Sequence, residues 1–149
     1  MKIGLITSAG GHLFQLLQLR SCWDSNPHFW VSFNKSDVNS LLKDQVLYFS
    51  YYPESRNLFN FFRNFWLAII ILLKEKPQVL ISAGAGITLP FYLIGKLMRI
   101  TLIYIEPLDF IKKPSLTGRL VYPLVDLFLI QNIKQQKYFP KAKYWGSTL

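Results

Sequence analysis

The sequence predicts a single α/β domain over residues 1–149, built on one doubly wound, Rossmann-like parallel sheet. Two observations support this fold class. Short runs alternate with helical patterns along the chain, and most of the runs are apolar throughout, as in strands that are covered on both faces. Glycine turns also follow two of the runs, as in sheets that bind ligands at their carboxyl edge. Six strands fit one such domain, and we expect the order 3-2-1-4-5-6.

The first strand covers residues 3–6 and ends in the turn S-A-G-G-H, before a helix over residues 13–23. A helix that starts behind such a turn points unpaired N–H groups at a ligand, and it can hold a phosphate or a pyrophosphate. Gly10 and Gly11 allow a close approach, and Ser8 adds a hydroxyl donor. His12 at the mouth can bind phosphate or accept a proton from a sugar hydroxyl, or it merely caps the helix.

The next strands are expected at residues 29–33 and 46–49, with a short helix or turn at 36–43 and a loop at 51–56. The longest helix follows at residues 58–74, and residues 65–73 carry no polar side chain. Basic residues flank this stretch, which fits a helix lying on anionic lipid, with contacts from Phe59, Phe62, Arg63, Trp66 and Ile70. The alternative is a helix packed between the sheet and a partner protein.

A fourth strand at residues 79–82 leads into a second glycine turn, with Gly84 and Gly86, and a helix at 88–98. The first and fourth strands flank the switch point of the sheet, so both glycine turns are expected to face one crevice. Glu106 ends the fifth strand (102–105), where it can bind sugar hydroxyls or act as a base, or form an ion pair with Lys112, Lys113 or Arg119. A short helix to residue 124, a last strand at 127–131 and a helical turn at 135–139 complete the elements.

Composition and missing motifs narrow the functional class. The chain carries a net charge of +9 with 16% aromatic residues, which favours an anionic membrane surface over a nucleic acid, since no nucleic-acid motif is present. A single cysteine excludes a disulfide framework. Neither the dinucleotide fingerprint, a P-loop, metal-ligand spacing nor a nucleophile elbow occurs, so no cofactor and no metal are expected. No signal peptide and no segment of about 20 apolar residues is found.

Five motifs occur in one order along the chain: S-A-G-G-H-L-x-Q-L-L, P-Q-V-L-I-S-A-G-A-G-I-T-L-P, I-Y-I-E-P, S-L-T-G-R-L-V-Y-P-L-V-D-L-F-L-I-Q and Y-F-P-K-A-K-Y-W-G. Together they resemble the Alg-fourteen family, whose bacterial branch includes the PssD- and CpsF-type capsule and exopolysaccharide subunits. The resemblance runs almost from end to end. It implies the N-terminal half of a GT-B glycosyltransferase.

The resemblance implies a subunit that binds a polyprenyl-diphosphate-linked sugar and recruits a partner to the cytoplasmic face of the membrane. The partner, of the Alg-thirteen or PssE type, binds the UDP-sugar donor, and this chain is expected to be inactive alone. Eukaryotic members carry an N-terminal membrane anchor that is not seen here. We therefore expect the helix at residues 58–73 to meet the membrane as a peripheral contact.

A wider similarity to the lipid II synthase MurG implies that Ser8, Gly10, Gly11 and His12 meet the acceptor pyrophosphate. It also places Glu106 at the acceptor, so that His12 or Glu106 activates the acceptor hydroxyl. The turn with Gly84 and Gly86 belongs to the same acceptor site, although it departs from the G-P-G-T form of the eukaryotic branch. The partner is expected to dock on the carboxyl-edge loops and on the tail, residues 144–149.

Two rival functions remain open at this point. One is a self-sufficient small enzyme that binds a nucleotide or a sugar phosphate. Turnover of such a substrate by the purified chain alone would favour this function. The other is a purely structural membrane recruiter, which would keep its activity after mutation of the whole glycine turn.

Overall fold

The computed structural model describes residues 1–54 and 56–148, and these form one seven-stranded parallel sheet in the order β3-β2-β1-β4-β5-β6-β7. The first six strands confirm the predicted order, and β1 pairs with both β2 and β4 at the centre. The strands are β1 (Ile3–Ile6), β2 (His28–Ser32), β3 (Leu47–Phe49), β4 (Val79–Ser82), β5 (Thr101–Ile105), β6 (Leu127–Ile130) and β7 (Lys143–Tyr144).

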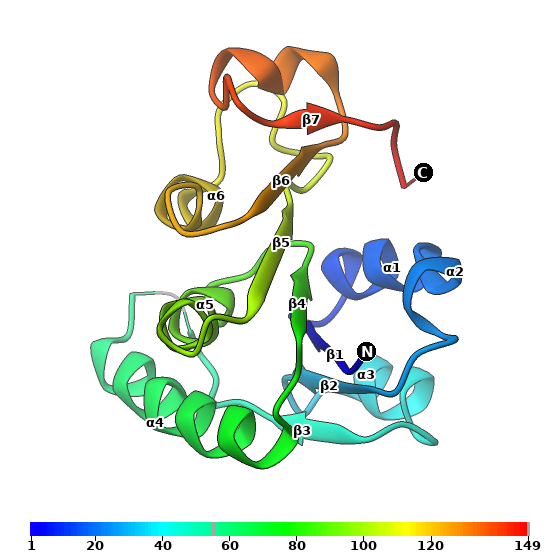
Figure 1. Cartoon of the computed structure of the whole chain (residues 1–149), viewed down its shortest axis with the longest axis vertical. Helices are drawn as coiled ribbons and strands as arrows, with labels where there is room; N and C mark the ends of the chain where they lie inside the picture. Colours follow the sequence, from blue (N-terminus) through cyan, green and yellow to red (C-terminus); the bar gives the residue numbers. More distant parts are fainter. Residues whose placement is uncertain (55, 149) are drawn as a thin grey trace.

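Helices cover the two faces of the sheet unequally (Figure 1). One face carries the long helix α4, then α5 and α6, while the other carries α1, α2 and α3 beside β1, β2 and β3. The helices are α1 (Gly11–Gln18), α2 (Arg20–Trp23), α3 (Ser36–Leu41), α4 (Leu58–Glu75), α5 (Thr88–Leu97), α6 (Leu116–Val121) and the 3₁₀ helix η1 (Ile133–Lys137).

Several predicted boundaries are corrected by the structure. The helix expected at residues 13–23 is two helices, because the chain turns at Leu19 with a backbone ψ of 20°. The helix expected to reach residue 124 ends at Val121. The sheet has a seventh strand, of only two residues, which is too short to leave a hydrophobic pattern in the sequence. The predicted loop and tail include Ser55 and Leu149, which lie outside the described residues.

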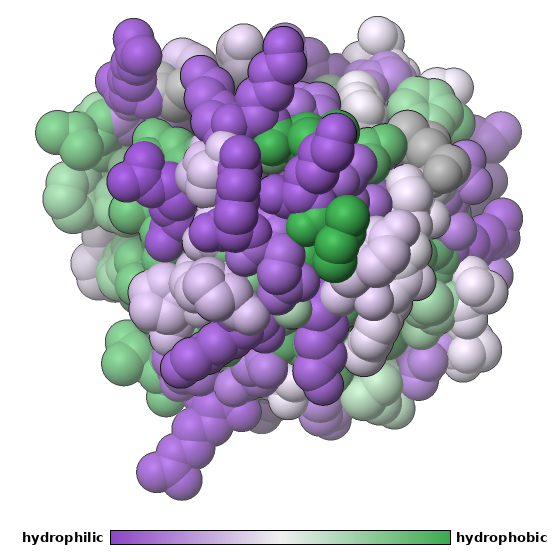
Figure 2. All heavy atoms as spheres, turned by 90° about the horizontal axis from the view of Figure 1, so that it is seen from above, coloured by the Kyte–Doolittle hydropathy of each residue, from purple (hydrophilic) through white to green (hydrophobic). Residues whose placement is uncertain are grey.

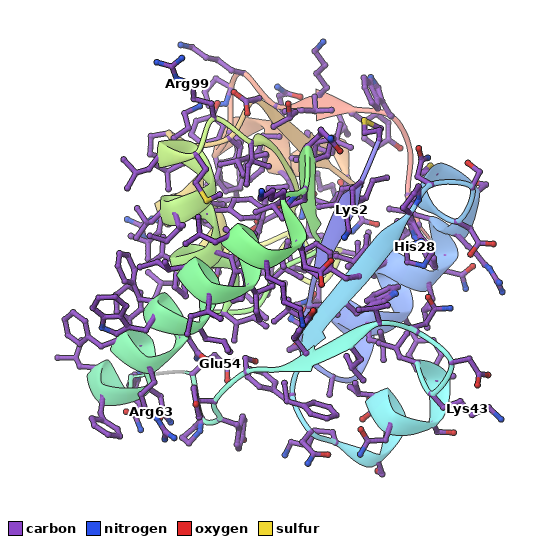
Figure 3. The ribbon with its side chains drawn as sticks, turned by 60° about the horizontal axis from the view of Figure 1, so that its bottom comes forward. Lys2, His28, Lys43, Glu54, Arg63 and Arg99 are labelled. Carbon is purple, nitrogen blue, oxygen red and sulfur yellow. The ribbon has the colours of Figure 1, made fainter. Side chains whose placement is uncertain are left out.

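Helix α4 buries two polar residues and exposes a row of apolar ones, while Ala68, Ile71 and Leu72 complete its buried face. Asn60 and Asn64 face the protein, where the Asn64 side chain accepts from the Tyr51 backbone N–H at 2.8 Å and donates to the Tyr51 carbonyl at 3.0 Å. Six apolar side chains therefore point outward: Leu58, Phe59, Phe62, Trp66, Ile70 and Leu73. Figure 3 shows the side chains of α4 projecting away from the rest of the molecule, with Arg63 near its N-terminal end. Isolated exposed apolar residues are ordinary, but a continuous patch indicates a binding surface.

The opposite end of the sheet has a different surface. Figure 2 looks onto the β7 end and shows hydrophilic side chains over most of it. Exposed lysines of η1 and of the chain around β7 contribute to its charge: Lys134, Lys137, Lys141 and Lys143. Along residues 1–54 and 56–148, no helix combines the length and the apolar character needed to cross a bilayer.

Candidate functional site

The two glycine turns meet at the carboxyl ends of β1 and β4, as predicted for turns that flank the switch point. The His12 ring lies against the second turn, with its Nδ1 2.9 Å from the Ala83 carbonyl oxygen. Gly84 has φ +113°, and a Cβ there would lie 2.8 Å from the His12 ring and from Pro107. Glycine is required at this position by both the backbone conformation and the close approach.

This contact determines what His12 can do. A carbonyl oxygen only accepts, so Nδ1 carries the proton and donates it to Ala83, and in the neutral ring Nε2 keeps a free lone pair. The Nε2 atom can therefore accept a proton from a ligand. His12 does not cap helix α1, because the N-terminus of that helix has no side-chain cap. His12 lines two cavities.

The larger cavity has a volume of 620 Å³ and lies between α4, α5, α6 and the loop that follows β5. Three cationic side chains line it, from three separate segments: Arg56 before α4, Lys113 before α6, and Arg119 on α6. Glu54 is the carboxylate among the lining residues, and its Cγ would lie 2.7 Å from a Cβ on Gly86. Figure 3 places Glu54 near the N-terminal end of α4. The apolar lining includes Phe61, Leu89, Phe110, Leu116 and Leu120.

The first glycine turn lies beside a smaller cavity of 430 Å³, lined by Gly11, His12, Gln15, Leu108 and Asp109. The Gly10 N–H donates to the Asp37 carboxylate at 2.7 Å, so a carboxylate of α3 already occupies this donor. The Ser8 hydroxyl donates to the neighbouring Ala9 carbonyl at 3.2 Å. The structure thus places Gly11, His12 and Gly86 along two cavities, while Ser8, Gly10 and Gly84 line neither.

Glu106 is fully buried behind the wall of the larger cavity. Its two oxygens accept from the Ser115 N–H at 2.7 Å and from the Ser115 hydroxyl at 2.9 Å. The Ser115 side chain also caps α6 by accepting from the Gly118 N–H. The expected alternative, an ion pair with Lys112, Lys113 or Arg119, is wrong. The partner of the Glu106 carboxyl group is Ser115, at the N-terminal end of α6.

Burial controls the protonation of this cluster. Loss of solvation raises the pKa of Glu106 to about 7, against the opposing effect of the two Ser115 donors. Burial, and next the Glu106 charge, raise the pKa of Tyr104, which keeps this phenol protonated. The Tyr104 hydroxyl lies 3.4 Å from the Ser115 Oγ, and Tyr104 and Ser115 both line the larger cavity. These two residues, and not Glu106 itself, present polar atoms to a ligand there.

Sequence reasoning missed a network of buried amides behind the site. The Gln131 side chain donates to Gln15 at 2.7 Å and to the Glu106 backbone carbonyl at 3.0 Å. It also accepts from the backbone N–H and the hydroxyl of Thr148 in the C-terminal tail. Gln15 on helix α1 is itself buried. Buried amides that satisfy one another leave no periodic signal in a sequence.

No metal site is evident in the part of the chain that the structure describes, where no three His, Cys, Asp or Glu side chains are grouped to hold an ion. The fold defines a class: a Rossmann-like domain of the kind that forms one half of a GT-B fold, with its candidate site at the carboxyl edge of the sheet.

Within this class, the chain belongs to the Alg14 family. The family model described as "Oligosaccharide biosynthesis protein Alg14 like" matches residues 3–148. A human relative, "UDP-N-acetylglucosamine transferase subunit ALG14", is 22% identical over 177 residues, covering 98% of this chain and 82% of its own. The protein of the same name from Candida albicans is 30% identical over 89 residues, covering 56% of this chain and 41% of its own.

Solved structures show the same fold. MurG of Acinetobacter baumannii superposes with a TM-score of 0.76 at 16% identity, over 99% of this chain and 46% of that one. UDP-N-acetylglucosamine 2-epimerase of Rickettsia bellii gives a TM-score of 0.78 at 14% identity, over 99% and 45%. The chain therefore spans a little under half the length of these two proteins.

Proposed function

We propose that this protein is the acceptor-binding, membrane-associating subunit of a two-chain glycosyltransferase in capsular or exopolysaccharide biosynthesis. It would work at the cytoplasmic face of the membrane with an Alg-thirteen- or PssE-like subunit that binds the donor. The reaction is transfer from a UDP-sugar to a sugar carried on a polyprenyl diphosphate. The observation that carries the proposal is a cavity edged by His12 and by cationic side chains, beside an outward-facing apolar helix.

Helix α4 is the proposed membrane contact. Phe59, Phe62, Trp66 and Ile70 each expose more than half of their side-chain surface, at 72, 61, 65 and 62%. Such a stripe, with cations at its ends, fits the interface of an anionic bilayer. Arg63 lies in this region with its guanidinium 3.6 Å from the centre of the Tyr51 ring. A lipid-linked acceptor would then reach the cavity without leaving the membrane surface.

The partner is proposed to cover the opposite face of the sheet. A groove of 360 Å³ runs there across β4, β5 and β6, with Ile81, Ile103, Leu127 and Leu129 only partly buried. Parallel sheets normally have both faces covered, so this face is incomplete in the single chain. The tail lines the same groove, and Trp145 is 68% exposed at its edge. This arrangement supports the tail as part of the docking surface.

Within the site, His12 is the proposed base. Its Nε2 can accept the proton of the acceptor hydroxyl while Nδ1–H holds the ring against Ala83. Glu106, fully enclosed by Ser115 and α6, acts as a positioning residue. It fixes the N-terminal end of α6 and thereby the cavity wall that carries Ser115 and Arg119.

The test is a transfer assay with the reconstituted pair, a UDP-sugar and a lipid-diphosphate-linked acceptor. His12→Ala should lower kcat by about 100-fold or more, since loss of a general base typically costs 10²–10⁴. His28→Ala is the matched control, because His28 on β2 is held by Asn26 and Gln45 and lines neither site cavity. Full activity of His12→Ala would show that His12 is not the general base. Activity that also survives replacement of the whole first glycine turn would favour a purely structural recruiter.

A further inference from the structure

We infer that the diphosphate of the acceptor binds in the larger cavity, on Arg56, Lys113 and Arg119, and not on the first glycine turn. The inference rests on the proposed function and locates its anionic ligand. It differs from the expectation that Ser8, Gly10 and Gly11 hold this group, and the charges around the two cavities are the reason.

The first glycine turn is electrostatically a poor place for two phosphates. Its Gly10 N–H already binds the Asp37 carboxylate at 2.7 Å, so an incoming phosphate would have to displace a negative charge. The cavity beside Gly11 is lined by a second carboxylate, Asp109, and by no lysine or arginine. Like charges at this distance oppose binding of an anion.

The larger cavity has the opposite balance. Three cations line it against the single carboxylate Glu54. The structure shows no ion pair for Arg56, Lys113 or Arg119 among residues 1–54 and 56–148, where the paired cations are Lys2, Arg20 and Lys96. Unpaired guanidinium and ammonium groups that converge from three segments suit a diphosphate, because each can make charge-assisted hydrogen bonds to its oxygens.

The floor and the walls of the cavity fit the rest of such a ligand. Tyr104 lines the cavity, and the contact that its hydroxyl makes with the Ser115 Oγ, within the described part of the chain, is long at 3.4 Å, so this hydroxyl can donate to an anion in the cavity. Leu116 and Leu120 on α6 line the cavity and are 70% and 46% exposed. On α4, the lining residue Phe61 packs edge-on against the exposed Phe62, with ring centres 5.7 Å apart. An isoprenoid chain therefore has a continuous apolar path from the cavity to the α4 face.

Calorimetric binding of farnesyl diphosphate to the full chain tests this inference. Inorganic pyrophosphate and phosphatidylglycerol vesicles are the comparison ligands, because they share the phosphate chemistry without the isoprenoid diphosphate. We expect farnesyl diphosphate to bind at least about tenfold more tightly than pyrophosphate, since burial of several isoprenoid carbons adds to the phosphate contacts.

Two double variants separate location from total charge. Lys113→Gln with Arg119→Gln should weaken farnesyl diphosphate binding by about 100-fold, at about tenfold for each lost charged hydrogen bond. Lys112→Gln with Lys134→Gln removes the same charge from exposed side chains that do not line the cavity, and it should change binding less than about threefold. Circular dichroism of both proteins checks that they are folded.

Asp37→Asn examines the competing site. If the first glycine turn held the diphosphate, removal of this carboxylate would tighten binding by about tenfold and the cavity variants would have no effect, which would overturn the inference. The inference would also be overturned if the wild type did not bind farnesyl diphosphate, or bound it no more tightly than pyrophosphate. Binding to phosphatidylglycerol vesicles without binding to farnesyl diphosphate would overturn it as well. None of these binding results decides whether the reconstituted pair transfers sugar, which is measured separately. The proposed function fails only if that transfer is absent.

Discussion

Replacement of Glu106 by Gln should make the protein more stable at neutral pH than the wild type. Burial raises the pKa of Glu106 from an ordinary 4.5 to about 7. The folded protein thus holds this proton more tightly than the unfolded chain, so the stability from this group is complete below pH 4.5 and falls as the pH rises to 7. The difference of 7 − 4.5 = 2.5 corresponds to about 3 kcal/mol at about 1.4 kcal/mol for each pKa unit.

Urea unfolding at pH 4.5 and at pH 8 measures this effect. The free energy of unfolding of Glu106→Gln minus that of the wild type should increase by about 3 kcal/mol between the two pH values, because glutamine cannot ionise. Groups that do not interact with residue 106 contribute equally in both proteins and cancel in the difference. A difference that stays constant with pH would refute the reasoning, because Ser115 would then solvate the carboxylate as well as water does.

Three further variants, one of them a double substitution, test the membrane face and the packing around the site. The double variant Phe62→Asp with Trp66→Asp should no longer float with anionic liposomes. The control Leu41→Asp, on the exposed side of α3, should float as the wild type does. Unchanged flotation of the double variant would indicate that α4 binds a protein and not the membrane. Asn64→Ala should lower the free energy of unfolding in urea by about 2 kcal/mol, because two backbone groups of Tyr51 lose their partner. Gly118→Ala should cost about 3 kcal/mol or more in the same assay, since its Cβ would lie 2.1 Å from a Glu106 oxygen; a wild-type value would mean that α6 shifts freely.

The strand order and the meeting of the two glycine turns could be predicted from the sequence, because both follow from local patterns and the rules of parallel sheets. His12 was accordingly expected beside the crevice, and its ring contacts Ala83 of the second turn. The family resemblance was likewise visible in five ordered motifs, and the match to the Alg14 family confirms it.

Contacts between distant segments could not be read from the sequence. Asn64 faces inward, where its amide bonds the backbone of Tyr51, 13 residues earlier, and a row of apolar side chains on the other side of α4 faces outward. Asp37 reaches Gly10 across 27 residues, and Ser115 rather than a lysine satisfies Glu106. None of these pairs has a spacing that repeats, so the charge distribution of the two cavities emerges only in three dimensions.

The central claim is that this chain supplies the acceptor side of a glycosyltransferase and that a second subunit supplies the donor side. The most direct measurement is the rate of sugar transfer from a UDP-sugar, beginning with UDP-N-acetylglucosamine, to a lipid-diphosphate-linked acceptor. We predict transfer by the mixture of this chain with an Alg-thirteen- or PssE-like subunit and none by either protein alone. Transfer by the purified chain without a partner would contradict the account.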